Sequence, residues 1–353
     1  MEGAGYGRAF VGLSPTNYRT LTGELDEQLH AVWPGPVEFP DWPSGITRAG
    51  MLARLVRNAK RYEAIVLDGS VGLRAAYGDL WAAAVAGRLG RHGPAVLVAD
   101  ATWKRGVSVL DRAALRAGIR LVDAPNVSFC VLTRGEAELF PRTWNVEPGK
   151  VYFAHWPHTL AADELDATAE GGVFAGGDSL RDYGPLVEAA RGIDAEVTIA
   201  TRRRELLEAA DLPRNVRAGP LPHDRYVDAL RRAAVVVVPM QPTEERGAGQ
   251  TTYCNALAMG KLVIATDTLG VRDYIDDGET GVVVPPGDAS ALGAALAWAT
   301  AAANAEAVAR IAANARAMAR DRLAPDRYVV RLLEIARTAL ERRAATSRTS
   351  RSP

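Results

Sequence analysis

The chain has 353 residues, which is enough for two domains of about 150–200 residues each. Lys plus Arg and Asp plus Glu balance at 42 each, which excludes the strongly basic field that nucleic-acid-binding proteins carry. The two cysteines, Cys130 and Cys254, lie far apart and exclude a disulfide framework or a cysteine-based zinc site. No apolar run has the length of a signal peptide or a membrane span, so we expect a cytoplasmic protein.

Short apolar runs alternate with helical periodicity in the first half of the chain. The pattern predicts helices over 51–62, 80–89, 110–117 and 135–140. It predicts strands over 9–13, 64–68, 95–99, 121–122, 129–132 and 151–154. Apolar strands interleaved with helices are typical of a parallel sheet that is buried on both faces.

The second half repeats this alternation. Strands are predicted over 173–175, 196–200, 216–218, 235–238, 262–265 and 282–284, with helices between them. The fold class is therefore α/β, with two Rossmann-like, doubly wound domains facing a cleft. We place a first domain at 1–158, a second at 159–310 and helices divided by Pro325 over 311–343, and we expect the Ser/Thr/Arg-rich tail 344–353 to be disordered.

A glycine loop at 247–252 is the most informative stretch of the chain. The predicted strand 235–238 precedes it and a short helix follows, so Gly249, Gln250, Thr251 and Thr252 stand at a helix start. Unpaired amides and the helix dipole favour a bound phosphate at such a start. The alternative is an ordinary tight turn from strand to helix.

A second glycine loop, Gly176 and Gly177, directly follows the predicted strand 173–175. In doubly wound sheets, ligands bind at the carboxyl ends of the strands, where both glycine loops are expected. Arg181 follows within reach, and its guanidinium could neutralise a diphosphate. The alternative for Arg181 is a solvated residue at a helix start.

Six segments in order over 172–288 resemble the C-terminal half of GT-B glycosyltransferases, closest to the retaining glycosyltransferase family 4. They are 174–177, 181–183, 230–240, 255–261, 270–281 and 286–288. The resemblance implies a nucleotide-diphosphate-sugar donor in the second domain and an acceptor in the first. It also implies no catalytic metal or other cofactor, and helices at 311–343 that return toward the first domain.

The chain departs from this family at two places. The family carries two glutamates eight positions apart, of which the second contacts the nucleotide ribose, and Asn255 stands at that second position. Gly247 stands at the first, although Glu244 or Glu245 could replace it and bind hydroxyl groups of the sugar. The family's histidine after a strand of the first domain is replaced by Asp100, which we expect to orient or assist the acceptor. An N-cap is the alternative role for Asp100.

Trp103 and Lys104, just after Asp100, are candidate acceptor-binding residues. Trp33, Trp42 and Trp103 stand among Pro, Gly and polar residues, where an aromatic ring could stack on a sugar, although some tryptophans must belong to the core. The amphipathic segment 46–62 carries five basic residues and could lie on the inner face of an anionic membrane. A surface helix packed on the sheet is the alternative.

The sequence thus predicts a metal-independent glycosyltransferase of the hexosyltransferase type, acting with retention of anomeric configuration. Its acceptor would be a small molecule, a glycan or a lipid-linked molecule, and no nucleic acid is expected. Two alternatives stay open: an inverting GT-B transferase, and a catalytically weakened homologue that binds a nucleotide-sugar or a polysaccharide. The sequence predicts no oligomeric state.

Overall fold

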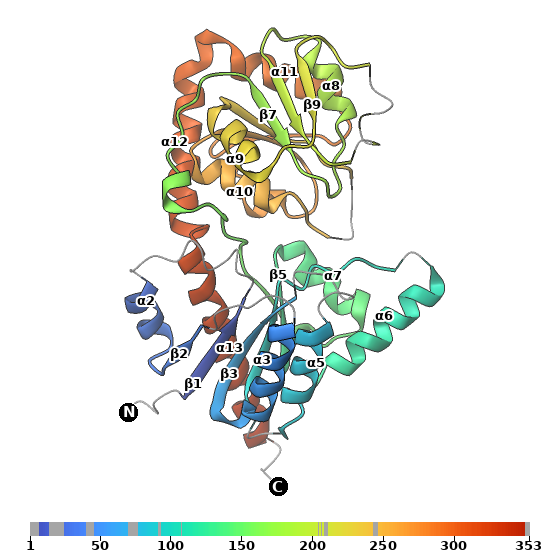
Figure 1. The fold of residues 1–353 in the computed structure, drawn as a ribbon, viewed down its shortest axis with the longest axis vertical. Coiled ribbons are helices and arrows are strands. Elements are labelled where there is room, and N and C mark those ends of the chain that lie inside the picture. The colour runs from blue at the N-terminus through green and yellow to red at the C-terminus, as the bar shows by residue number, and fades with distance from the viewer. Residues whose placement is uncertain are drawn as a thin grey trace. The chain divides into compact units, whose positions relative to one another are not determined.

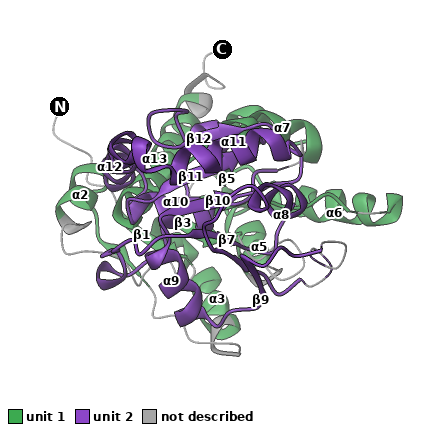
Figure 2. Ribbon diagram, turned by 90° about the horizontal axis from the view of Figure 1, so that it is seen from above, with its two compact units in different colours: residues 1–154, 325–353 green, residues 155–324 purple. Residues whose placement is uncertain are grey.

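A computed structural model describes residues 7–13, 25–39, 46–69, 77–90, 93–106, 108–203, 205, 207, 211–242 and 246–349 (Figure 1). The chain divides into two compact units, which Figure 2 distinguishes by colour. Unit 1 comprises Met1–Ala154 and Pro325–Pro353, and unit 2 comprises His155–Ala324. The first boundary therefore lies at residue 154, compared with the predicted 158, and the final helix belongs to unit 1.

Unit 1 contains a six-stranded sheet with the order β2-β1-β3-β4-β5-β6. All its strand pairs are parallel, and the order of its first strands follows the flavodoxin-like pattern of doubly wound sheets. The strands are β1 (Arg8–Gly12), β2 (Val37–Glu38), β3 (Tyr62–Asp68), β4 (Ala95–Ala99), β5 (Val127–Val131) and β6 (Val151–Phe153).

The described helices of unit 1 are α2 (Leu25–Val32), α3 (Ile46–Arg57), α5 (Tyr77–Ala86), α6 (Val109–Val122), α7 (Arg134–Trp144) and α13 (Pro325–Thr349). Helix α13 begins at Pro325, where the missing amide hydrogen of proline removes no helical hydrogen bond. It packs against β3 and β4, so the C-terminal end of the chain completes the unit that the N-terminal half builds (Figure 1).

Two predictions for unit 1 are wrong. The apolar pair at 121–122, predicted as a strand, forms the last turn of α6. Two apolar residues carry no period of their own, and the helix that starts with Ser108 as its N-cap continues through them. Trp33 and Trp103, considered as sugar-stacking residues, are 1% and 5% exposed and belong to the core.

The segment proposed for membrane contact is also packed inward. Helix α3 places Met51, Leu52 and Leu55 in the hydrophobic core of unit 1. These are the side chains that would have to enter a bilayer, so their face of the helix is already covered. Within the described ranges, no helix is both long and apolar enough to cross a membrane.

Unit 2 contains a second six-stranded parallel sheet, with the order β12-β11-β10-β7-β8-β9. Its strands are β7 (Val173–Gly176), β8 (Val197–Ala200), β9 (Val216–Gly219), β10 (Val235–Val238), β11 (Leu262–Thr266) and β12 (Val282–Val284). Its α-helices are α8 (Gly184–Ala190), α9 (His223–Arg232), α10 (Gln250–Ala258), α11 (Ala289–Thr300) and α12 (Ala305–Arg322).

The order of unit 2 reverses between β7 and β10, as in the dinucleotide-binding Rossmann sheet. Strand β10 consists of four buried valines, whose branched side chains suit a sheet covered on both faces. The loops after β7 and β10 leave the sheet in opposite directions at this point, and a bridge between Arg181 and Met240 joins them. The predicted α/β fold with two Rossmann-like domains is confirmed.

Candidate functional site

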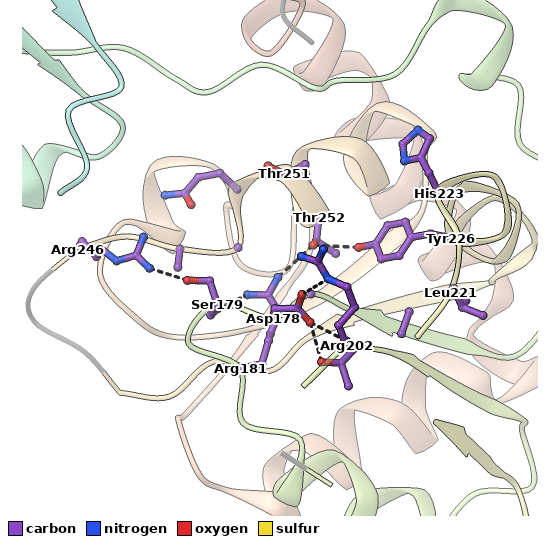
Figure 3. Close-up of a pocket in the computed structure, with 16 residues that line it drawn as sticks. Asp178, Ser179, Arg181, Arg202, Leu221, His223, Tyr226, Arg246, Thr251 and Thr252 are labelled. Carbon is purple, nitrogen blue, oxygen red and sulfur yellow. Dashed lines mark hydrogen bonds and ion pairs between the residues drawn. The ribbon is translucent and has the colours of Figure 1, made fainter. Parts of the chain in front are cut away.

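A pocket of about 610 Å³ lies in unit 2 at the carboxyl ends of the strands. It is lined by residues that follow β7 (177–181), by the end of β8 and its loop (200–202), by the loop before α9 and its first turns (221–226), and by the loop before α10 and its first turn (246–252). Figure 3 shows these side chains converging from separate segments of the chain. The two glycine loops predicted from sequence therefore meet in one pocket.

Arg181 is the buried cation of this pocket, with 3% of its surface exposed. Its guanidinium donates hydrogen bonds to Gly176 O (3.0 Å), Ser179 O (3.0 Å) and Thr252 Oγ1 (3.1 Å). All three acceptors are neutral, and no carboxylate of the described residues forms a salt bridge with Arg181. Burial lowers the pKa of the guanidinium, yet arginine stays charged near neutral pH. A buried charge without a salt bridge is costly even when a carboxylate such as Asp178 acts on it from further away, and a bound anion would offset that cost.

The two glycines after β7 make room for this arginine. A Cβ atom on Gly177 would lie 2.6 Å from Arg181 Nη2, and the φ angle of +120° at Gly177 disfavours any side chain. A Cβ atom on Gly176 would lie 2.5 Å from the hydroxyl oxygen of Tyr226. Both glycines are therefore required by the packing of the pocket floor, in addition to any contact with a ligand.

The hydroxyl groups of Thr252 and Tyr226 lie together beside the Arg181 guanidinium. Thr252 Oγ1 accepts from Arg181 Nη2 and lies 3.3 Å from the hydroxyl oxygen of Tyr226 and 3.3 Å from Gly176 O. Thr252 is buried, so its hydroxyl serves the protein's own network, as the dashed lines in Figure 3 show. Its contact with Arg181 indicates a positioning role, and its expected contact with a ligand stays a prediction.

The N-terminus of α10 faces the same pocket. Gly249 is the N-cap residue with φ of +95°, and its neighbours Val238 and Met240 leave little room for a Cβ atom. No described acceptor takes the amide hydrogens of Gly249, Gln250 or Thr251. Such unpaired amides, together with the helix dipole, attract an anion.

Two side chains at the start of α10 add polar groups. Thr251 is exposed, lines the pocket, and its hydroxyl has no partner among the described residues. Gln250 is 7% exposed, and its buried Nε2 makes no hydrogen bond. An unpaired buried donor is rare in folded proteins and costs about 1–3 kcal/mol, which a ligand acceptor would recover.

The rim of the pocket is rich in charge. Asp178 accepts hydrogen bonds from Thr201 Oγ1 (2.8 Å), from the Arg202 amide (2.9 Å) and from Arg202 Nε (2.8 Å). Burial acts to raise the pKa of Asp178, but the hydrogen bonds from Arg202 and Thr201 outweigh it and lower the pKa. Arg246 donates to Ser179 Oγ at 2.5 Å. Among the described residues that line the pocket there are thus three arginines and one aspartate, so these residues together carry a net positive charge.

Asn255 lies one turn further along α10 and does not line this pocket. Its Oδ1 accepts from the Thr159 amide at 2.8 Å, and its Nδ2 donates to Thr159 Oγ1 at 3.2 Å. The side chain is 6% exposed. Asn255 therefore ties α10 to the segment that begins unit 2, and its role in ribose binding stays a prediction.

The candidates of unit 1 follow strand β4. Asp100 is buried with φ of +52°, and its Oδ1 accepts from Thr102 Oγ1 at 3.0 Å. No helix starts at Asp100, so it is not an N-cap. Trp103 donates to Gly69 O at 3.0 Å, and its ring packs against core aromatic residues, so it offers no face to an acceptor. Lys104 is exposed.

Glu244 and Glu245 lie outside the described residues, so their predicted contact with sugar hydroxyls stays a prediction. Sequence reasoning missed the positioning contact of Tyr226 and the contacts of Asp178 and Arg246. No motif marks Tyr226 or Arg246. Asp178 could have been found from its place one residue after the second glycine of a strand-end loop.

Residues 177–301 match the family model described as "Glycosyl transferases group 1". No curated protein matches the chain. The matched segment begins in the glycine loop after β7 and includes every residue of the pocket, so the match and the geometry identify the same part of unit 2.

Solved structures match almost the whole chain. A glycosyltransferase from Rickettsia africae has a TM-score of 0.63 at 13% identity, with 95% of this chain and 99% of that chain covered. A sucrose-phosphate synthase from Thermosynechococcus elongatus has a TM-score of 0.59 at 17% identity, with 96% and 100% covered. HepE of Anabaena, solved in complex with UDP, has a TM-score of 0.57 at 14% identity, with 96% and 100% covered. The chain thus has the fold of GT-B glycosyltransferases, and its residues 177–301 are similar to the glycosyltransferase group 1 family.

Proposed function

We propose that the protein is a glycosyltransferase whose unit 2 binds a nucleotide-diphosphate sugar and transfers its sugar to an acceptor. The observation that carries this proposal is Arg181, a buried cation held only by neutral groups at the edge of a pocket. The unpaired amides of 249–251 face the same pocket, so its floor offers two independent attractions for a diphosphate. HepE, a structural neighbour, has been solved in complex with UDP-glucose, which supports a donor of this class.

In the proposed reaction, the bond between the anomeric carbon of the sugar and the diphosphate oxygen breaks. A new bond forms between that carbon and a hydroxyl oxygen of the acceptor, and the departing phosphate takes the hydroxyl proton. Arg181 and the α10 amides stabilise the negative charge that develops on the leaving diphosphate. An oxocarbenium-like transition state depends on this stabilisation of the leaving group. Retention of configuration is supported by the resemblance to the retaining family 4.

The proposed reaction uses no metal ion. A cation is needed in many transferases to neutralise the leaving diphosphate, and here three arginines surround the pocket that would hold it. In unit 1, we propose that Asp100 orients the acceptor, that Lys104 contributes a positive charge beside it, and that the acceptor is a small molecule, a glycan or a lipid-linked molecule. Full kcat in Asp100→Asn would remove this aspartate from the mechanism.

A second candidate function is a binding protein for nucleotide-sugars with weakened catalysis. The observation in its favour is Asn255, which stands where the family has a glutamate and whose amide is bonded to Thr159. Because its amide is neutral, Asn255 cannot supply the charged contact to the ribose that a glutamate would make.

A thermal-shift screen separates the two candidates. UDP, GDP, ADP and dTDP and their sugars are each tested with magnesium and with EDTA, because a ligand that binds the folded state raises Tm. Selective stabilisation by one diphosphate in EDTA, together with hydrolysis or transfer of its sugar, supports the transferase. Stabilisation without any turnover favours the binding protein, and the absence of any shift contradicts both.

The site assignment is tested with Arg181→Gln against the matched control Arg217→Gln, which alters an exposed arginine on β9 outside the pocket. The Arg181 variant should lose the diphosphate-induced shift, whereas the control should keep it. An equal shift in both variants would show that the diphosphate binds elsewhere.

A further inference from the structure

Helix α6 of unit 1 exposes more large apolar side chains than any other described element. Of the five large hydrophobic residues that the described part of the chain exposes, three belong to α6: Val109 (71% exposed), Leu110 (83%) and Leu121 (68%). Their exposure is not required for folding, because Ile119 and Val122 already attach the helix to the core. A face of this kind marks an interaction surface.

The exposed apolar residues form a continuous stripe. Leu110, Ala113, Ala114, Ala117 and Leu121 are all exposed, and each lies three or four positions from another of the five, so they share one side of the helix. We call these five residues the apolar stripe. It runs along most of a helix of 14 residues, or about 21 Å.

A second stripe, made of arginines, runs beside the first. Arg112, Arg116 and Arg120 are exposed and recur at intervals of four, which places them on the flank of the apolar stripe. The one acidic residue of α6, Asp111, lies in the first turn. Its backbone amide donates a hydrogen bond to Oγ of the N-cap residue Ser108. The chain as a whole carries balanced charge, so this row of cations is a local concentration.

The neighbouring helix also exposes a large aromatic side chain. Helix α5 packs beside α6 and carries Trp81, which is 55% exposed. Tryptophan is enriched where proteins meet the boundary between lipid and water, because its ring has an apolar body and a polar edge.

We propose that α6 is the docking surface of this protein for an anionic lipid bilayer. The apolar stripe would enter the boundary of the acyl chains, while the arginine stripe would lie level with the negatively charged headgroups. A helix that lies in the plane of a membrane has this division into an apolar side and a cationic flank along its length. This surface replaces α3, whose Met51, Leu52 and Leu55 are buried, and it is independent of the function proposed for the pocket of unit 2.

Co-sedimentation of the full chain with vesicles tests the proposal. Vesicles of phosphatidylcholine with phosphatidylglycerol are compared with pure phosphatidylcholine, at low and at high salt. The protein should bind the anionic vesicles at low salt, and the binding should weaken as salt screens the charges. Each of Arg112→Gln and Arg120→Gln should weaken binding roughly fivefold. The combined variant Leu110→Ser and Leu121→Ser should weaken it by about tenfold or more.

Matched controls come from unit 2. Leu212→Ser alters an exposed leucine (38% exposed), and Arg217→Gln alters an exposed arginine, so both should bind vesicles like the wild type. All the altered side chains are at the surface, and an unchanged melting curve verifies that each variant is folded. Absence of wild-type binding to anionic vesicles at low salt, or equal binding by the α6 variants and the controls, would overturn the proposal. A dimer in light scattering that the leucine variant abolishes, without vesicle binding, would also overturn it and assign the stripe to a second copy of the chain.

Discussion

The contact between Thr252 and Arg181 leads to the sharpest prediction for the pocket. Thr252→Val keeps the volume of the side chain and removes its hydroxyl. The guanidinium then loses an acceptor 3.1 Å away, in a place where both residues are buried. A hydrogen bond to a charged group contributes about 1.5–3 kcal/mol, and a buried donor without a partner costs a similar amount.

Two magnitudes follow from that energy. If the hydrogen bond serves to hold Arg181 toward the ligand, the affinity for a nucleoside diphosphate falls about ten- to hundredfold, since 1.4 kcal/mol corresponds to a factor of ten. The melting temperature of the ligand-free protein falls by roughly 3–12 °C, taking about 2–4 °C per kcal/mol for a unit of this size. The affinity for the nucleoside without phosphates should stay as in the wild type, because Arg181 would contact only the phosphates.

Isothermal titration calorimetry with the nucleoside, its monophosphate and its diphosphate measures this difference. Thr252→Ser is the matched control, because it loses a methyl group and keeps the hydroxyl, and its diphosphate affinity should stay within about threefold of the wild type. Suppose that the valine variant binds the diphosphate as tightly as the wild type, or loses nucleoside and diphosphate affinity equally. Either result would refute the positioning role of Thr252, while binding by the wild type would leave the proposed function intact.

Three further predictions test other contacts. Gly177→Ala should lower the diphosphate affinity more than tenfold, because the new Cβ atom would meet Arg181 Nη2. The matched control is Gly278→Ala, at a glycine with φ of +77° and open space around it. This control should show only the backbone strain of about 1–2 kcal/mol, seen as a lower Tm with normal diphosphate binding. Gln250→Leu removes the unpaired buried Nε2, so the ligand-free Tm should stay equal or rise, while the Tm increase caused by the diphosphate should shrink; a lower ligand-free Tm would show that the amide is already satisfied. Burial, with a smaller effect of Arg231, lowers the pKa of Lys261 from 10.5 to about 8. Between pH 8 and pH 10.5 the unfolded state therefore binds more protons than the folded state, so the free energy of unfolding should rise as the pH increases through this range. Urea unfolding of the wild type and of Lys261→Met at pH 7.5 and 9.5 checks this, and a stability difference between the two proteins that does not change with pH would contradict the pKa shift.

The period of the apolar runs allowed much of the fold to be predicted. The four valines of β10 and the runs of β4 and β11 are short, continuous apolar segments that contain β-branched residues, so their assignment as strands needed no tertiary information. The pair at 121–122 was assigned wrongly because two residues do not distinguish a strand from the end of a helix. Strand β2 (Val37–Glu38) was missed for the same reason.

The site was predicted in part. The loops around Gly177 and Gly249 could be recognised because glycine at the end of a strand has a local meaning that the sequence shows. The same local view misjudged Trp103, since the polar residues around it in sequence do not reveal the aromatic residues that cover it in the core. The contact between the hydroxyl groups of Tyr226 and Thr252 joins residues that are 26 positions apart, and no sequence pattern around either residue indicates it.

The order of apolar and glycine segments along the chain was therefore sufficient for the α/β class, for most of the strands and for the two glycine loops that line the pocket of unit 2. These features depend on interactions between residues that are close in sequence. The burial of Arg181, its hydrogen bond to a threonine 71 residues away and the exposure of the apolar stripe on α6 were decided by tertiary structure. Burial is a property of what the rest of the chain places around a side chain, and a charged or apolar residue looks the same in sequence whether it is covered or exposed.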